Sequence, residues 1–234
     1  MQNSVVSKVS EKKLSIDLGV NNLATLFFEG GESYVISGGP VKSTNQFYNK
    51  KKAKLQSALK KCQSKYSSKG LGKLTKKRHL KIEDFFHKVS KKIVGLAEEK
   101  NIGTIVIGKN KNWKQKISLG KKTNQSFTQI PFNSFIQKIT YKAELKGVKV
   151  VVVEESFTSK IDHLAGESLK KQENYLGERV HRGLFKSSTG KILNADVNGA
   201  IGILRKVIPR NDVKLIEGIE GCALNPIKIN PFAT

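Results

Sequence analysis

The chain has 234 residues, and its 43 lysines and arginines outnumber its 19 aspartates and glutamates, which leaves a net charge of +24. This excess predicts a polyanionic partner. Nucleic acid is favoured over a membrane, because the basic residues are spread along the chain and no apolar run reaches the roughly 18 residues of a membrane span. Cys62 and Cys222 lie too far apart to indicate a disulfide framework or a cysteine zinc site, and we expect a cytoplasmic protein.

The first predicted strand lies within residues 12–25, which read KKLSIDLGVNNLAT. Apolar residues alternate with polar ones there, and Asp17 stands among them, shortly before a glycine and two asparagines. A carboxylate beside a sheet core needs a compensating partner, so Asp17 either caps the following turn or coordinates a cation. Two further strands, at residues 23–28 and 33–37, flank an EGGE turn and predict an antiparallel meander.

Residues 43–99 predict a long helical hairpin. Its first helix carries an apolar stripe opposite a face that is almost entirely lysine, and the stripe consists of Leu55, Ala58, Leu59, Cys62 and Tyr66. The apolar residues of the second helix recur at intervals of three to four, and they are Ile82, Phe85, Phe86, Val89, Ile93 and Leu96. Cys62 is therefore predicted to be a small core residue rather than a reactive thiol.

Residues 103–107 form a short apolar run typical of a buried parallel strand, and a polar loop follows. Trp113 lies in this loop among basic residues that include Lys109, Lys111 and Lys114. The mixture favours stacking on a base beside phosphate contacts. The alternative, equally compatible with the sequence, is that Trp113 packs against the protein as an anchor of the loop.

Pro131 opens an amphipathic helix that ends at Gly147, and residues 148–153 then have the pattern of a buried strand. Glu154 and Glu155 follow that strand immediately. An acidic pair therefore stands at the end of a hydrophobic strand, much as Asp17 stands beside the first one.

Residues 156–193 are rich in loop-forming and basic residues, and they predict an insertion that contacts nucleic acid through Arg179, Arg182 and Lys186. A closing helix begins near residue 194, and Asp196 lies in its first turn, where the helix dipole favours an anion. The tail, residues 209–234, has little periodicity and is predicted to be irregular.

This order of elements predicts one α/β domain of the RNase H-like class, with a central mixed sheet and the two insertions. In that architecture carboxylates from the first strand, a neighbouring parallel strand and the last helix converge at one end of the sheet. Asp17, either Glu154 or Glu155, and Asp196 occupy these places. Neighbouring residues point to opposite faces, so only one of the two glutamates can take part. Because three clustered carboxylates repel one another, we expect them to bind Mg2+ or Mn2+. Divalent ions held in this way promote the hydrolysis of phosphodiesters.

The chain resembles the TnpB or OrfB family of transposon-encoded proteins along nearly its whole length. The matching blocks are LSIDLGVNNLAT, TIVIGKNKNWKQK, NQSFTQIPF, EESFTSK, HRGLFKSSTGKILNADVNGAIGIL and IEGIEG. The resemblance implies a RuvC-like nuclease domain and activity as an RNA-guided DNA endonuclease, with a DNA target and a transposon-derived guide RNA as partners, near the prokaryotic nucleoid. It also implies that Asp17 and Asp196 are the first and last catalytic aspartates.

Two departures from the family pattern concern the site and the insertion. The family's second acidic residue ends the parallel strand, where this chain has Gly108, so Glu154 or Glu155 would supply that carboxylate from the adjacent strand. The family's zinc ribbon has two cysteine pairs between the positions of Thr158 and Asp196, and no cysteine stands there in this chain. We therefore expect a ribbon-like insertion without zinc.

A third departure concerns extent, because family members carry an N-terminal region that grips guide RNA, and this chain starts almost at the nuclease domain. It is therefore expected to be the catalytic half alone. The alternatives are a nuclease-dead relative that binds nucleic acid, such as an RNA-guided repressor, and a decayed transposon product.

Overall fold

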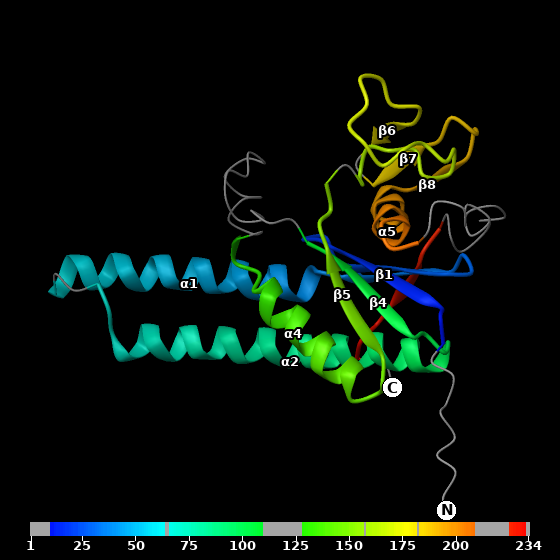
Figure 1. The fold of residues 1–234 in the computed structure, drawn as a ribbon. Helices are drawn as coiled ribbons and strands as arrows, with labels where there is room; N and C mark the ends of the chain where they lie inside the picture. Colours follow the sequence, from blue (N-terminus) through cyan, green and yellow to red (C-terminus); the bar gives the residue numbers. More distant parts are fainter. Residues whose placement is uncertain are drawn as a thin grey trace, which may run out of the picture.

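The protein is built around a central mixed sheet, seen in a computed structural model that describes residues 10–63, 66–109, 128–156, 158–181, 183–208 and 225–232. The strand order is β5-β4-β1-β2-β3-β9 (Figure 1). These strands are β1 (Lys13–Leu18), β2 (Asn22–Phe28), β3 (Ser33–Ser37), β4 (Thr104–Gly108), β5 (Lys149–Val153) and β9 (Ile227–Ile229). β1 pairs antiparallel with β2 and parallel with β4, so the first strand lies inside the sheet.

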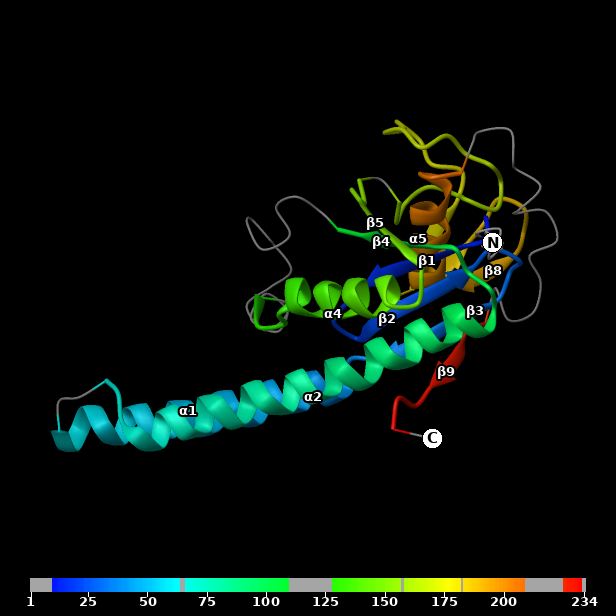
Figure 2. The same cartoon turned by 60° about the horizontal axis from the view of Figure 1, so that its bottom comes forward.

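Helices cover both faces of this sheet. On one side lie α1 (Gly39–Gln63), α2 (Lys69–Glu99) and α4 (Phe132–Glu144), and on the other lies α5 (Ala195–Arg205) (Figure 1, Figure 2). A smaller antiparallel sheet packs beside α5 and consists of β6 (Glu178–His181), β7 (Leu184–Lys186) and β8 (Ile192–Asn194). The chain is thus a mixed α/β protein with a central sheet.

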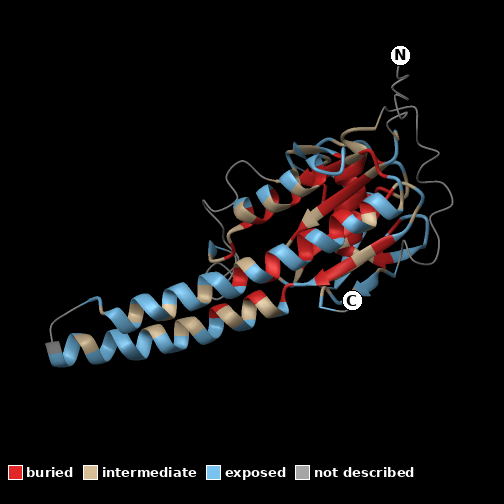
Figure 3. Cartoon of the chain, turned by 90° about the horizontal axis from the view of Figure 1, so that it is seen from below, coloured by how far each residue is buried: buried red, intermediate tan, exposed pale blue. Residues whose placement is uncertain are grey.

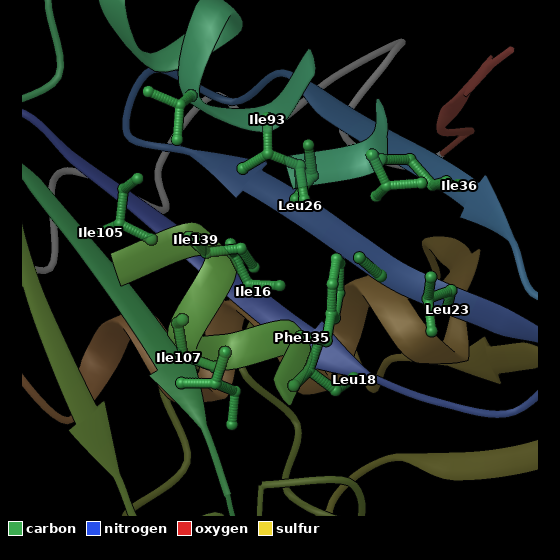
Figure 4. Close-up of a cluster of buried hydrophobic side chains, with 14 of the residues drawn as sticks. Ile16, Leu18, Leu23, Leu26, Ile36, Ile93, Ile105, Ile107, Phe135 and Ile139 are labelled. Atoms are coloured by element: carbon green, nitrogen blue, oxygen red, sulfur yellow. The ribbon is translucent and has the colours of Figure 1, made fainter. Parts of the chain in front are cut away.

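The alternation of side chains along β1 separates the core from the opposite face of the sheet. Leu14, Ile16 and Leu18 are buried on the face covered by α2 and α4, and Figure 4 shows Ile16 and Leu18 among the core side chains there. Ser15 points the other way, and its hydroxyl donates a hydrogen bond to the carbonyl oxygen of Ala200 in α5, at 2.7 Å. Asp17, two residues on, shares the face of Ser15 and therefore lies toward α5.

The helical hairpin is longer and more exposed than the sequence predicts. α1 already begins at Gly39, and the outer half of the hairpin extends beyond the sheet (Figure 3). The prediction that Cys62 is a core residue is wrong, because its side chain is exposed. Among the described residues, the outer half of the hairpin extends beyond the sheet (Figure 3), and two helices alone cannot enclose a core. None of the described helices is both long enough and apolar enough to cross a membrane.

The strand after α4 also differs from its prediction. Residues 148–153 have the apolar pattern of a fully buried strand, yet β5 stands at the edge of the described sheet, and its Val152 is 49% exposed. Its apolar sequence is explained in part by Val150, which packs against the core cluster that also contains Ile139 of α4. Sequence periodicity reports apolar content, and it does not distinguish an edge strand from a central one.

Replacing Phe86 by alanine should destabilise the fold by about 3–5 kcal/mol, because its fully buried ring packs 4.8 Å from that of Phe135, measured between centroids. Cys62→Ala is the control, and it should change the free energy of unfolding by less than about 0.5 kcal/mol. Urea unfolding measures both. Equal losses for the two variants would show that the hairpin stripe is a core after all.

Candidate functional site

Asp17 lies near the end of β1, and its carboxylate faces α5. A Cβ placed on Gly199 of α5 would come within 2.8 Å of Asp17 Oδ2, so the glycine allows the helix to approach the carboxylate. The start of α5 is set by Asn194, whose side-chain oxygen accepts hydrogen bonds from the N–H groups of Asp196 and Val197 at 2.9 and 3.3 Å. Because Asp196 and Gly199 are three residues apart, they share the helix face that meets Asp17.

Glu155 reaches the same place from the turn after β5. Its carboxylate lies over Gly108, the last residue of β4, and a Cβ on Gly108 would overlap both Glu155 and Ile203. Gly108 and Val153 are partners in the parallel register, so the two strands end side by side. The glutamate therefore fills the space that a side chain at position 108 would occupy.

Asp196 is held by two polar neighbours. Asn22 Nδ2 donates a hydrogen bond to Asp196 Oδ2 at 2.8 Å, which ties the helix to the turn that follows β1. Arg179, on β6 of the insertion, places a guanidinium nitrogen 3.8 Å from Asp196 Oδ1. About half of the Arg179 side chain is exposed, so this ion pair is weak and can open.

The surroundings of Asp17 and Glu155 raise the pKa of both carboxyl groups. Burial, followed by the negative charges of Glu155 and Asp196, raises the pKa of Asp17 well above its usual value, and Arg179 opposes this shift. Burial also raises the pKa of Glu155 to about 7, and the ammonium group of Lys206 opposes that shift. Because both pKa values are raised, ionising Asp17 and Glu155 together costs free energy unless a cation lies between them.

The donor set fits a hard divalent cation. Carboxylate oxygens are the ligands that Mg2+ prefers, and Asp17, Glu155 and Asp196 supply them from three different elements. In the part of the chain that the structure describes, however, no three Asp, Glu, His or Cys side chains already stand close enough together to hold a metal ion. Asp196 is engaged with Asn22 and Arg179, so its carboxylate would have to turn toward Asp17 to join a shared ion.

The structure distinguishes the two adjacent glutamates that the sequence leaves equivalent. Glu154 is exposed, whereas Glu155 is partly buried over Gly108. Lys206, just beyond the end of α5, donates a hydrogen bond to the carbonyl oxygen of Glu154 and a second, at 3.4 Å, to the hydroxyl of Ser156. These two contacts tie the turn to α5 on both sides of Glu155. No sequence pattern indicated this role for Lys206.

Three of the basic residues proposed as nucleic-acid contacts lie in the part of the chain that the structure describes. Lys109 directly follows β4, and its N–H donates to the carbonyl oxygen of Val153 at 2.8 Å. Lys186 is exposed on β7, and Arg179 lies at the acidic cluster. Four further predicted contacts lie outside the described residues, and they are Lys111, Trp113, Lys114 and Arg182.

The insertion that carries Arg179 is organised around a buried carboxylate, Asp162. Its oxygens accept hydrogen bonds from the hydroxyl of Ser187 at 2.8 and 2.9 Å, from the N–H of Ser188 at 2.7 Å and from the N–H of Ala165 at 3.2 Å. Glu167, also buried, accepts a hydrogen bond from the N–H of Asp162 at 2.7 Å. The sequence could not reveal this network, because its partners lie up to 26 residues apart.

His163 joins the same network to α5. Its Nε2 lies 2.7 Å from the carbonyl oxygen of Thr158, which can only accept, so Nε2 carries the proton. Its Nδ1 is then the acceptor for Arg205 at 2.9 Å. Burial lowers the pKa of His163 to about 4, so the ring is neutral at neutral pH. Gly202 of α5 leaves room for the ring, since a Cβ there would overlap it.

Two family models cover most of the chain. Residues 1–114 match the OrfB family, described as "Probable transposase", and residues 132–203 match the "Cas12f1-like, TNB domain". TnpB-like protein ORF457 of Acidianus two-tailed virus is 26% identical over 204 residues, which cover 84% of this chain and 42% of that protein. CRISPR-associated endodeoxyribonuclease Cas12f2 of a Micrarchaeota archaeon is 24% identical over 214 residues, covering 86% and 38%. The chain thus spans less than half the length of these relatives.

Two solved Cas12f structures have a fold similar to that of this chain. A Cas12f1 complex with sgRNA and target DNA aligns with a TM-score of 0.59 at 20% identity, covering 82% of this chain and 49% of that one. A CRISPR-Cas12f ternary complex aligns with a TM-score of 0.58 at 19% identity, covering 85% and 40%.

Asp162→Asn should destabilise the insertion by about 2–3 kcal/mol, because a charged acceptor with several donors is lost. Burial favours the protonated acid, but the donors from Ser188, Ser187 and Ala165 outweigh it and hold the pKa of Asp162 below its usual value. The stabilisation is therefore present above the unfolded pKa, near 3.9, and is lost as pH falls through the lower folded pKa.

Hydrogen exchange of the insertion's amides, followed from pH 7 to pH 3, measures this effect. Asp84→Asn, which alters only an exposed pair with Lys88, is the control and should leave the exchange unchanged. EDTA should also have no effect, since hydrogen bonds hold the insertion together. Protection that disappears with EDTA, or that survives Asp162→Asn, would contradict this account.

Proposed function

Because the chain belongs to the TnpB family of transposon-encoded proteins, we propose that it is a metal-dependent DNA endonuclease domain whose target is selected by a guide RNA. The observation that carries the proposal is the convergence of Asp17, Glu155 and Asp196 beside the end of β1. The relatives support it, since one is named an endodeoxyribonuclease and the Cas12f1 structure of similar fold holds sgRNA and target DNA.

We assign the central sheet to the RNase H-like, or RuvC-like, class. The assignment rests on the strand order β3-β2-β1-β4-β5, on the antiparallel pairing of the first three strands and on the parallel pairing of β1, β4 and β5. α5 packs across β1, β2 and β4. This order places the first strand, the end of a parallel strand and the closing helix at one point, which is where the carboxylates lie.

Asp17, Glu155 and Asp196 are the proposed ligands of Mg2+ or Mn2+. When bound, these ions activate water and stabilise the negative charge of the scissile phosphate. Other residues of the chain shape this site. Gly199 and Gly108 leave space for the carboxylates, and Lys206 contacts the turn that carries Glu155. Arg179, displaced from Asp196, is placed to pair with a phosphate of the DNA strand.

We propose that the remaining basic surface binds nucleic acid. The hairpin over residues 43–99, the loop with Lys109, Trp113 and its neighbouring lysines, and the insertion over residues 156–193 with Lys186 supply this surface. The insertion needs no zinc in this proposal, because the network around Asp162 does the work of holding it together. The prediction of an irregular tail over residues 209–234 is wrong for its last part, because β9 (Ile227–Ile229) pairs parallel with β3 in the central sheet.

The second candidate function is nucleic-acid binding without cleavage, as in an RNA-guided repressor. It is favoured by one observation: the position at the end of the parallel strand, where the family pattern has an acidic residue, is Gly108 in this chain. The two functions differ in whether Glu155 replaces the missing carboxylate.

The purified chain should nick single-stranded DNA with Mg2+ or Mn2+, and EDTA should stop the reaction. Asp17→Ala or Asp196→Ala should reduce the cleavage rate by on the order of a thousandfold, because each removes charge that stabilises the transition state. Cleavage of labelled DNA on a denaturing gel measures this. If the Asp17→Ala protein cuts as fast as the parent, the assigned site is wrong.

Glu155→Gln and Glu154→Gln form a matched pair of adjacent changes with the same chemistry. Gln keeps the shape and removes the charge that Mg2+ needs. Glu155→Gln should end cleavage with little loss of stability or DNA affinity, whereas Glu154→Gln should cut like the parent, because its side chain is exposed. Activity that is lost in Glu154→Gln and kept in Glu155→Gln would overturn the assignment. If the parent protein cleaves DNA in the presence of neither Mg2+ nor Mn2+, and Gly108→Glu alone gains cleavage, the function as a repressor would be favoured.

A further inference from the structure

The two hairpin helices enclose a cavity of about 290 Å3 near the point where they leave the sheet. Its wall combines hydroxyl, aromatic, apolar and basic side chains, namely Ser43, Thr44, Phe47, Leu74, Lys77 and Lys81. We call it the hairpin groove. A second hollow of about 480 Å3 adjoins it along α2, and it shares Lys77 and Lys81 and adds Lys73 and Lys76. The groove therefore opens onto a lysine-lined track.

The exposed ring of Phe47 is the feature of the groove that indicates a ligand. Its ring is 57% exposed on a wall that also contains Leu74. A single exposed phenylalanine on a flat surface needs no explanation. Here the ring stands in a concave wall with cations at the rim, including Lys51, whose Nζ lies 5.8 Å from the ring centroid. An aromatic face beside cations is how proteins hold an unstacked base with its phosphate.

Of the basic residues in the groove, Arg78 has a structural role, whereas Lys77 and Lys81 can contact a ligand. Arg78 donates to Asn45 Oδ1 and to the carbonyl oxygen of Gln129, both at 2.7 Å, so it braces the wall. Lys77 and Lys81 are exposed and, being four residues apart on α2, point the same way. They can each contact a phosphate without giving up an internal contact that the structure records for them.

We propose that the hairpin groove binds one unstacked nucleotide of a single-stranded RNA, with the base on Phe47 and the adjoining phosphates on Lys77 and Lys81. The charge of the rim favours a polyanion over an apolar protein segment. RNA is preferred to DNA because Ser43 and Thr44 line the same wall, and a hydroxyl there can pair with the ribose 2′-OH. Ser43 donates to the carbonyl oxygen of Pro40 at 3.1 Å, which leaves its oxygen as an acceptor.

The position of the groove separates it from the acidic cluster. The hairpin lies on the side of the sheet opposite α5, whose first turn carries Asp196 (Figure 1). The groove is therefore a site separate from the acidic cluster. This inference rests on the proposed function only in taking nucleic acid as the partner, and it does not depend on cleavage.

Binding of a 12-nucleotide RNA with one central 2-aminopurine, measured in EDTA, tests the proposal without any cleavage. The fluorescence of 2-aminopurine should be quenched by the parent and by Phe47→Tyr, because both keep a stacking ring. Phe47→Ala should lose the quenching and about tenfold in affinity, as expected for one stacked base, with an unchanged salt slope. Tyr66→Ala removes an aromatic side chain outside the groove that is even more exposed than Phe47, and this variant should behave like the parent.

Lys77→Ala and Lys81→Ala should give the complementary result. Each should reduce the slope of log affinity against log salt by about one and retain the quenching, because a phosphate contact is lost while the ring remains. Quenching that persists in Phe47→Ala, or that is lost equally in Tyr66→Ala, would overturn the groove as the site. DNA of the same sequence that binds and quenches as well as the RNA would overturn the assignment to RNA. Loss of cleavage with binding intact would affect the proposed function alone.

Discussion

The charge of Asp17 is the constraint on which the site depends. The strand that carries it is central to the sheet, with apolar neighbours on one face and α5 on the other, so the carboxylate cannot move away from Glu155 and Asp196. Burial and the two negative charges raise its pKa, which means that this arrangement costs the folded state free energy. We propose that a cation bound at the end of the central strand offsets this cost, and Arg179 compensates part of the negative charge beside Asp17.

Glu155 and Gly108 are best understood as one feature. A side chain at position 108 and the carboxylate of Glu155 would compete for the same space, so the chain accommodates one of them. The adjacent parallel strands end in register, which lets a residue just past β5 reach the end of β4. Lys206 then holds the backbone on both sides of Glu155.

The sequence predicts the positions of several helices and strands well, but it predicts poorly which other elements pack against them. Alternation located β2 and β3 to within a residue, and the start of α5 was expected near residue 194, because these signals are local. The exposure of Cys62 and the edge position of β5 were missed, since both depend on which elements lie nearby. For the candidate site, Asp17 and Asp196 were predicted from the sequence and stay a prediction, and the choice between Glu154 and Glu155 needed the turn geometry. The partners of Asp162 are distant in sequence and had no local signal.

The most direct test of the acidic cluster as a metal centre is a crystal structure of the parent protein soaked in Mn2+, with anomalous scattering used to locate the ions. The account predicts manganese between Asp17 and Asp196, with Glu155 as a ligand and Arg179 moved away from Asp196. Manganese that binds without Glu155, or no anomalous peak at the end of β1, would contradict the central claim that this relocated glutamate completes the site.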